Sequence, residues 1–381
     1  MPDIELDRLQ ASLASLGRPF TPLDVVVSLR AMGVAVTDAG VHDVLADLRR
    51  HSVGAGPLED LLGRPGVSDV VVNGPRDVFV DTGQGLERAP VTFVDDEQVR
   101  RLAIRLAAAA GRRLDDATPF VDGRLPSGVR LHAVLAPVAA PGTCISLRVP
   151  AARSFSLQDL VQAGSLPDAG ATLLRAVVDR RVPFLVSGGT GSGKTTLLAA
   201  MVGLIPHTER VVLVEDAREL VPDHPHCVRL EARPANAEGT GAITLTTLVR
   251  QALRMRPDRV VLGEVRGAEL TDLLTALNTG HEGGCGTIHA NSIQDVPARL
   301  EALAALGGMG REACHAQVAA ALKLVIHVVR DPGGRRRVAQ IGVFRRREDG
   351  RVDVLPAATL SSSGVSHGEG AHLLRLAVGP C

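Results

Sequence analysis

The sequence predicts an α/β protein whose second half contains a parallel sheet covered by helices on both faces. Short runs of Val, Leu and Ile follow one another between residues 182 and 288, and helix-forming segments separate them. Continuous apolar runs are typical of parallel strands buried on both faces, and alternation with helices is typical of a doubly covered sheet. We therefore predict a RecA-like core with strands at Val182–Val186, Arg210–Val214, Cys227–Leu230, Arg259–Leu262 and Gly286–Ile288.

The residues before this core are predicted to form two smaller regions. Residues 1–55 are expected to be a helical appendage of three helices, the second beginning at Thr21-Pro22 and the third near Thr37, because these residue types begin helices. Residues 56–149 are expected to form a smaller mixed α/β domain around a helix at Asp96–Ala110. Its strands are expected at Val67–Val72, Val78–Asp81, Val129–Val138 and Cys144–Val149.

Three further segments complete the predicted organisation. Residues 150–167 are expected to be a linker, in which a helix begins because Ser156 and Asp159 have the spacing of a capping box. Residues 168–348 contain the RecA-like domain. In residues 349–381, Asp349-Gly350 predicts the turn of a C-terminal hairpin, and the serines after residue 360 predict a disordered tail.

A glycine-rich loop lies between the run at Val182–Val186 and an apolar, helix-like run at Leu197–Leu204. Its glycines let successive backbone N–H groups turn toward phosphate oxygens, and the following helix points its positive end at them. Lys194 has the spacing to bridge the β and γ phosphates of ATP, and Thr195 the spacing to ligate Mg²⁺. The alternative is a glycine-rich turn without a ligand. The predicted nucleotide-binding residues are Gly188, Gly189, Thr190, Gly191, Ser192, Gly193, Lys194, Thr195 and Thr196.

Lysine usage favours a nucleotide site over an unliganded turn. Of the 42 Lys and Arg residues, only Lys194 and Lys323 are lysines, so arginine carries almost every positive charge. A compact ammonium on a flexible stem fits between two phosphates, where a planar guanidinium fork does not. The choice of lysine at position 194 therefore indicates a phosphate ligand.

Composition restricts the partners that the protein can have. The 42 basic and 42 acidic side chains balance, so no overall field attracts nucleic acid or anionic lipid. Trp and Tyr are absent, which removes the stacking surfaces that single-strand binders use. The five scattered cysteines, the acidic N-terminus and the lack of an apolar span of about 20 residues predict a cytoplasmic protein. We expect no direct binding to nucleic acid.

Acidic residues follow two of the predicted strands. Glu215 and Glu219 come after the run at Arg210–Val214, and Glu264 ends the next buried run and is followed by Arg266. Open α/β sheets place their ligand chemistry at such strand ends. Glu264 is therefore a candidate Walker B acid and magnesium ligand, and the alternative is a polar strand end without a ligand.

Two histidines, His281 and His289, flank the last run of the predicted sheet. With Cys285 they are spaced four residues apart, which on a helix would suit a metal ion, but the glycines between them disfavour a helix. Two roles remain open for the histidines. They could sense the γ-phosphate, or they could satisfy buried polar groups at a strand end.

The order of these motifs resembles the type II/type IV secretion ATPase superfamily. The match comprises the Walker A loop, an acidic "Asp box" at Glu215–Glu219, a Walker B variant with glycine in place of the usual Asp before Glu264, and a "His box" at His281–His289. The stretches RPAN, LRMRPD, GEVRG and TGHEGG look most like the tight-adherence (Tad/Flp) pilus assembly ATPases. Residues 119–130 resemble that family's N-terminal signature. The alternative for this stretch is a solvated hairpin without a functional role. The sequence departs from the family's usual motifs at Cys285, Gly286 and Arg218.

This resemblance implies a hexameric ATPase that acts with Mg²⁺ as a motor. Its partners would be further copies of itself and a pilus or secretion platform in the inner membrane, so it would lie at the inner face of that membrane and reach it only through partners. Glu264 would orient the metal's water shell, and either Glu215 or Glu219 would activate the attacking water. Phosphoryl transfer also uses a positive group from another domain or chain. Candidates for this group are Arg124, Arg130, Arg148 and Arg153.

Three other functions are compatible with parts of the sequence. A type IV secretion or conjugation motor would use the same chemistry with a different partner. A regulatory scaffold that binds ATP without turning it over is disfavoured by the intact Glu215, Glu219 and Glu264. A small-molecule kinase is disfavoured because no separate acceptor-binding segment lies between the motifs.

Overall fold

The computed structural model describes Leu9, Ser12 and residues 21–34, 54–83, 85–150, 154–235 and 239–379. The chain divides into two compact units, Met1–Pro150 and Ala151–Cys381, and this division falls at the start of the expected linker. Arg153 and the helix expected near Thr37 lie outside the described residues. Within the part that the structure describes, no helix is long and apolar enough to cross a membrane.

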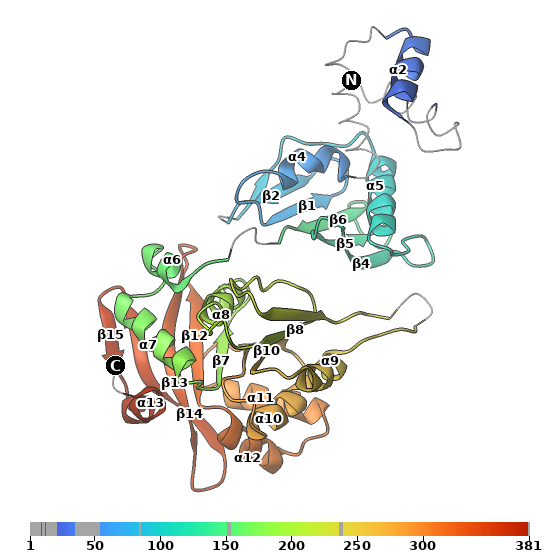
Figure 1. The fold of residues 1–381 in the computed structure, drawn as a ribbon. Helices are drawn as coiled ribbons and strands as arrows, with labels where there is room; N and C mark the ends of the chain where they lie inside the picture. Colours follow the sequence, from blue (N-terminus) through green and yellow to red (C-terminus); the bar gives the residue numbers. More distant parts are fainter. Residues whose placement is uncertain are drawn as a thin grey trace. The chain divides into compact units, whose positions relative to one another are not determined.

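The first unit contains a six-stranded sheet, described here by itself (Figure 1). Its strand order is β3-β2-β1-β6-β5-β4, with antiparallel neighbours throughout, and helix α5 contributes Val99, Leu102 and Leu106 to its core. The elements are α2 (Pro22–Ala31), η1 (Gly56–Leu58), α4 (Glu59–Leu62), β1 (Asp69–Asn73), β2 (Val78–Asp81), β3 (Leu86–Arg88), α5 (Asp96–Ala109), β4 (Phe120–Arg124), β5 (Arg130–Val134) and β6 (Cys144–Arg148).

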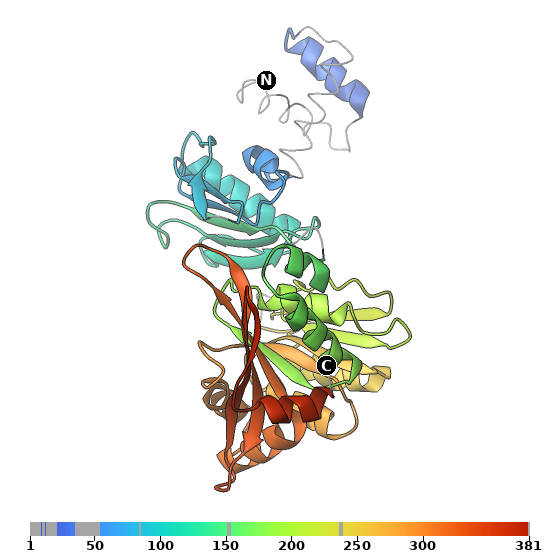
Figure 2. The same cartoon turned by 90° about the vertical axis from the view of Figure 1, so that its left-hand side faces the viewer.

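The second unit is built on a nine-stranded sheet, in the order β15-β14-β13-β12-β7-β11-β10-β8-β9. From β12 to β9 every neighbouring pair is parallel, whereas β12 to β15 are antiparallel. The strands are β7 (Phe184–Gly188), β8 (Val211–Glu215), β9 (Cys227–Glu231), β10 (Arg259–Val265), β11 (Cys285–His289), β12 (Leu324–Arg330), β13 (Arg336–Arg346), β14 (Val352–Ser361) and β15 (Gly364–His367). Figure 2 shows β13 and β14, in orange to red, as long strands along this sheet.

Helices cover both faces of the second sheet. On β7, Phe184 and Val186 belong to one apolar cluster with α7, α8 and α13, and Leu185 belongs to another with α9 to α12. Both faces of the strand are therefore buried, which is why its sequence is continuously apolar. The helices are α6 (Leu157–Gln162), α7 (Asp168–Asp179), α8 (Lys194–Val202), α9 (Leu245–Ala252), η2 (Leu253–Met255), α10 (Glu269–Asn278), α11 (Val296–Leu306), α12 (Arg311–Ala321) and α13 (Ala371–Val378).

The predicted secondary structure is confirmed over most of the described residues. The five predicted core strands correspond to β7, β8, β9, β10 and β11, and the predicted helix at Asp96–Ala110 is α5. Both expected helix starts form capping boxes, Thr21 with Asp24 and Ser156 with Asp159. The stretch at 119–130 forms the β4–β5 hairpin, and Asp349-Gly350 lies in the turn between β13 and β14.

The prediction of a disordered tail is wrong. Residues 364–367 form β15, which extends the sheet, and residues 371–378 form helix α13. Of the serines that suggested disorder, Ser361 ends β14, and Ser362 and Ser363 form the turn to β15. Leu374 and Val378 of α13 are buried in the same apolar cluster as α7, and this burial holds the segment in place.

Candidate functional site

The glycine-rich loop joins the end of β7 to the start of α8, at the carboxyl ends of the parallel strands. Gly188 lies so close to β12 that an added Cβ would be 2.4 Å from the Val328 carbonyl oxygen. Only glycine therefore allows the loop to leave β7 at this point. Helix α8 begins at Lys194, so its unpaired N–H groups and its positive end face the loop, as predicted.

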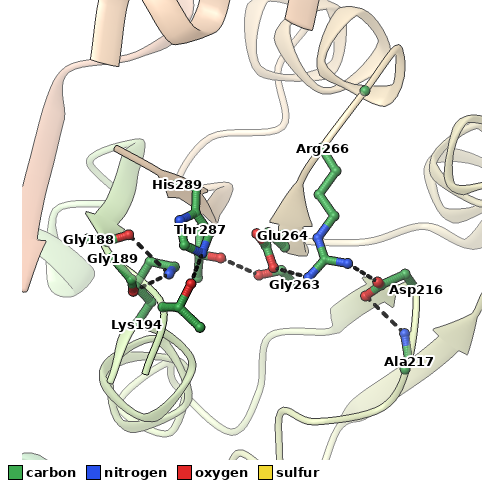
Figure 3. Close-up of polar contacts among 12 residues, drawn as sticks. Gly188, Gly189, Lys194, Asp216, Ala217, Gly263, Glu264, Arg266, Thr287 and His289 are labelled. Atoms are coloured by element: carbon green, nitrogen blue, oxygen red, sulfur yellow. Dashed lines mark hydrogen bonds and ion pairs between the residues drawn. The ribbon is translucent and has the colours of Figure 1, made fainter. Parts of the chain in front are cut away.

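Lys194 is buried, at 7% exposure, and its ammonium lies inside the loop. Its Nζ donates to the carbonyl oxygens of Gly188 at 3.1 Å and Gly189 at 2.9 Å (Figure 3). Burial lowers the pKa of Lys194, and the nearby charges of Glu264 and Glu219 raise it in partial compensation. A buried cation that donates its hydrogen bonds to carbonyl dipoles has an environment that suits an anionic ligand.

Arg266 connects two acidic residues beside the loop. One nitrogen of its guanidinium donates to Glu264 Oε2 at 2.7 Å, and another donates to Asp216 Oδ2 at 2.8 Å (Figure 3). The hydrogen bond with Glu264 raises the pKa of Arg266. Glu264, at the end of β10, and Asp216, just after β8, are thus held in one row at the strand ends. Glu264 and Arg266 were candidates from the sequence, whereas Asp216 was not, although it lies within the acidic stretch.

Glu215 is committed to the protein's own backbone. Its side chain is 2% exposed, and Oε1 accepts the N–H groups of both Glu219 and Leu220 at 2.8 Å. Oε2 makes a longer contact of 3.4 Å with Arg229. Burial raises the pKa of Glu215, and the two backbone hydrogen bonds counteract this effect. These contacts fix the turn that follows β8, and they assign Glu215 a structural role in shaping the acidic stretch.

Glycine at position 263 is required by Glu215. An added Cβ on Gly263 would lie 2.7 Å from Glu215 Cγ, so the usual Walker B Asp cannot be accommodated beside this buried glutamate. The Gly263 carbonyl oxygen also accepts a hydrogen bond of 2.7 Å from Thr287 Oγ1 (Figure 3). The glycine in the Walker B motif thus packs directly against the glutamate in the Asp box, and the glutamate leaves no room for a side chain at the glycine.

The two histidines lie at opposite ends of the same strand region. His289, at the end of β11, pairs in register with Gly188, and its Nε2 is 3.5 Å from Thr190 Oγ1. Burial and the charge of Lys194 lower the pKa of His289. His281 precedes β11, and its Nδ1 contacts the Ala276 carbonyl at the end of α10. The length of β11 thus separates His281 from the end of the strand where His289 pairs with Gly188.

The alternative of a metal site on the histidines does not fit this geometry. Cys285 and His289 are the two ends of β11, and four residues of strand span about 13 Å. His281 lies beyond the start of that strand, so the three side chains cannot share one ion. Among the residues described, no cluster of three His, Cys, Asp or Glu side chains could hold a metal.

Three of the four candidate arginines form a row on the sheet of the first unit. Arg124 on β4 pairs in register with Arg130 on β5, which pairs in turn with Arg148 on β6. Arg148 also donates to Asp69 Oδ1 at 3.0 Å, and Arg124 donates to the Gly128 carbonyl at 3.0 Å. The row brings three arginines together at the same end of strands β4, β5 and β6.

A pocket of about 310 Å³ opens beside the glycine-rich loop within the second unit. Its apolar wall is formed by Phe155, Leu160, Leu197, Val328 and Val338, and Gly193 and Thr196 of the loop and α8 border it. This pocket could not be predicted from the sequence. Its walls come from segments more than 180 residues apart, which no local pattern connects.

The chain matches the family described as "Type II/IV secretion system protein" over residues 51–360. A Mycobacterium tuberculosis protein named for conjugal transfer is 57% identical over 325 residues, covering 83% of this chain and 92% of the relative. The type IV secretion system protein VirB11 of Brucella suis is 32% identical over 298 residues, covering 72% and 82%. The crystal structure of the Legionella pneumophila ATPase DotB is 20% identical with a TM-score of 0.52, covering 77% of this chain and 79% of that one, which supports the fold.

The family match covers the first sheet and all of the second except the last residue of β14 and strand β15, and the matches to the two relatives extend over most of the relatives' own length. The protein belongs to the type II/IV secretion ATPase superfamily.

Proposed function

We propose that the protein is an ATP-hydrolysing motor and that its site binds ATP with Mg²⁺. The observation that carries this proposal is the buried Lys194 ammonium, which lies inside a loop between glycine carbonyls and beside a row of strand-end acids. A cation in such a position is stabilised when phosphate oxygens replace the carbonyl partners. The start of α8 contributes further N–H groups to the same anion.

The protein's residues fit such a nucleotide. Gly188 to Gly193 form a cradle in which a side chain at Gly188 would collide with β12. The 310 Å³ pocket beside Gly193 and Thr196 has a predominantly apolar wall, which suits a nucleoside whose phosphates lie on the loop. Mg²⁺ would be held by Thr195 and by water bonded to Glu264, and when bound it neutralises phosphate charge.

Hydrolysis requires a base for the attacking water, and Glu219 is the better candidate of the two Asp-box glutamates. Glu215 already accepts two backbone N–H groups, whereas Glu219 has an exposed residue surface and its charge acts on both Lys194 and Arg266. Arg266 would hold Glu264 and Asp216 in place while the site is loaded. His289, whose Nε2 contacts Thr190 Oγ1, would respond to the γ-phosphate.

We further propose that a homohexamer of this chain powers assembly of a Tad/Flp-type pilus at a platform in the inner membrane. The stretches RPAN, LRMRPD and GEVRG support this proposal through their resemblance to the Tad/Flp ATPases. A second candidate is a motor for conjugation or type IV secretion, which the names of the two relatives support. Copurification with a pilin platform protein would support the first function, and copurification with a conjugation coupling complex would support the second.

Two substitutions test the proposed chemistry. Lys194→Ala should abolish hydrolysis and sharply weaken binding of a fluorescent ATP analogue, because Lys194 contacts the ground-state phosphates. Glu264→Gln should leave binding within a few-fold of wild type, whereas hydrolysis should fall by roughly a hundredfold or more, because Glu264 acts on metal and water during transfer. Normal turnover in Glu264→Gln would contradict its assignment.

A further inference from the structure

The turn between β12 and β13 lies directly against the glycine-rich loop. Strand β12 pairs with β7 so that Val328 is opposite Gly188, and the Val328 carbonyl closes the space beside that glycine. Further along the loop, an added Cβ on Gly193 would be 3.5 Å from Arg336 Cδ. Residues 328–336, which are more than 130 positions beyond the loop in sequence, thus form one wall of it.

Two arginines of this wall approach Gly191. Arg336 Nε donates to the Gly191 carbonyl oxygen at 2.9 Å. Arg330 approaches the α-carbon of the same glycine, since an added Cβ on Gly191 would lie 3.8 Å from Arg330 Nη1. Neither arginine forms part of the Walker motifs, and neither was identified from the sequence.

The hydrogen bond to Gly191 determines which way the next N–H group points. In a planar trans peptide the C=O and the following N–H point in opposite directions. When Arg336 holds the Gly191 carbonyl outward, the N–H of Ser192 is directed to the other side. That N–H makes only a long bond of 3.4 Å to the Gly189 carbonyl, so phosphate can compete for it. A peptide whose N–H group points inward to bind phosphate has its carbonyl pointing outward, and that carbonyl needs a donor.

The segment that carries Arg336 is itself fixed in position. Asp331 pairs with Arg337 Nε at 3.1 Å, and the Asp331 N–H donates to the Arg335 carbonyl at 2.8 Å. Two residues after Arg336, the Val338 N–H donates to the Ser165 carbonyl at 2.9 Å. Because its own position is set by these contacts, Arg336 can hold the loop rather than follow it.

We propose that the β12–β13 turn is a clamp on the phosphate loop, in which Arg336 is a positioning residue that holds the Gly191 carbonyl outward. This proposal rests on the proposed function, because it assigns Arg336 a role in binding the phosphates of ATP from within the same chain. The clamp acts through one hydrogen bond from Nε, and the charge of the guanidinium is not required for it.

Two substitutions of Arg336 separate the hydrogen bond from the charge. Glutamine carries an N–H donor the same number of bonds from Cα as arginine Nε, whereas methionine has similar length and no donor. We expect Arg336→Met to weaken binding of a fluorescent ATP analogue roughly tenfold and to raise KM for ATP similarly. Arg336→Gln should recover most of this loss. The melting temperature without nucleotide should be nearly the same in both variants.

The controls distinguish failure of the clamp from failure of the proposed function. Arg345→Met removes an arginine from the same strand that pairs with Asp353, and it should leave ATP binding unchanged. Wild-type affinity for ATP in Arg336→Met would overturn the clamp. Equal losses of affinity in Arg336→Met and Arg336→Gln would also overturn it, because the charge of the guanidinium would then be responsible. Absence of ATP binding by the wild-type protein would instead overturn the proposed function, and the clamp with it.

Discussion

Glu215 and Glu219 belong to one acidic stretch but have different environments. Glu215 is buried and accepts two backbone N–H groups through a single oxygen, whereas Glu219 lies on the exposed side of the turn that those bonds form. A carboxylate whose oxygen is already occupied is poorly placed to take a proton from water. The structure thus shows that Glu215 shapes the turn, whereas Glu219 lies on its exposed side and its charge acts on Lys194 and Arg266.

Glutamine substitutions test this division of roles. Glu215→Gln keeps an oxygen that can accept both N–H groups, so stability and hydrolysis should stay near wild type. Glu215→Ala removes the acceptor, and the free energy of unfolding should fall by about 1–3 kcal/mol. Glu219→Gln should lower hydrolysis strongly without changing the melting temperature. Loss of turnover in Glu215→Gln at normal stability would reverse the assignment.

His327 is a buried histidine that the proposed chemistry does not use. It lies on β12 at 5% exposure, and its Nδ1 is 2.9 Å from the hydroxyl of Ser187, the residue before Gly188. Burial lowers the pKa of His327, the Lys194 charge lowers it further, and the Asn291 backbone and Asp295 raise it. The neutral form is therefore favoured in the folded protein.

The lowered pKa predicts a loss of stability in acid. Because the unfolded chain binds a proton at His327 more readily than the folded chain, the free energy of unfolding should fall as the pH drops below about 6.5, toward the lowered folded pKa. His327→Gln should show a smaller fall than wild type in urea titrations at pH 7.5 and 5.5. His372→Gln, which changes an exposed histidine, is the control. Identical pH dependence in wild type and His327→Gln would contradict the prediction.

At the scale of elements, the C-terminal residues complete the sheet and its helical cover. Strands β13 to β15 extend the parallel part in antiparallel order, and α13 contacts β14 and α7. Along α13, Leu374 is 3% exposed and Leu376 is 80% exposed. One face of this short helix is therefore part of the core of the second unit.

This pair of leucines gives a matched test of the role of α13. Leu374→Ala should lower the free energy of unfolding by about 2–4 kcal/mol, because it removes a buried side chain and leaves a cavity. Leu376→Ala should change it by less than about 0.5 kcal/mol. Chemical denaturation measures both. Equal effects of the two substitutions would show that α13 does not pack as described.

At the scale of the whole molecule, the arginine row and the ATP site lie in different units of the chain. Arg124, Arg130 and Arg148 are brought together by strand register, and the loop with its acids is complete within the second unit. Phosphoryl transfer commonly uses an arginine supplied by another domain or subunit. We therefore expect an arginine of the row to act on ATP bound by another chain.

Mixing two inactive variants tests action between chains. Arg130→Gln should lower turnover by roughly a thousandfold while its own loop still binds ATP, and Lys194→Ala should be inactive with its arginine row intact. A mixture of the two should recover part of the activity, and specific activity of wild type should rise with protein concentration. No recovery in mixed oligomers, or constant activity down to a demonstrated monomer, would contradict the expectation.

The sequence by itself determined the features that depend on neighbouring residues. The glycine spacing before Lys194, the capping pairs at Thr21 and Ser156, and the apolar strand runs act over a few positions, where backbone geometry is local. These features were enough to predict the loop, the parallel strands and the family resemblance. They also predicted that Glu264 lies at the end of a strand and that Arg266 follows it, as the structure shows.

Only the tertiary structure decided which side chains from distant strands meet. Packing of β10 against β8 explains Gly263 beside Glu215, pairing of β12 with β7 brings Arg336 to Gly191, and the length of β11 separates His281 from His289. Burial of Leu374 likewise orders a tail whose serines suggested disorder. The Gly263–Glu215 and Arg336–Gly191 contacts join residues 48 and 145 positions apart. Strand order and register determine such contacts, and local sequence patterns do not encode them.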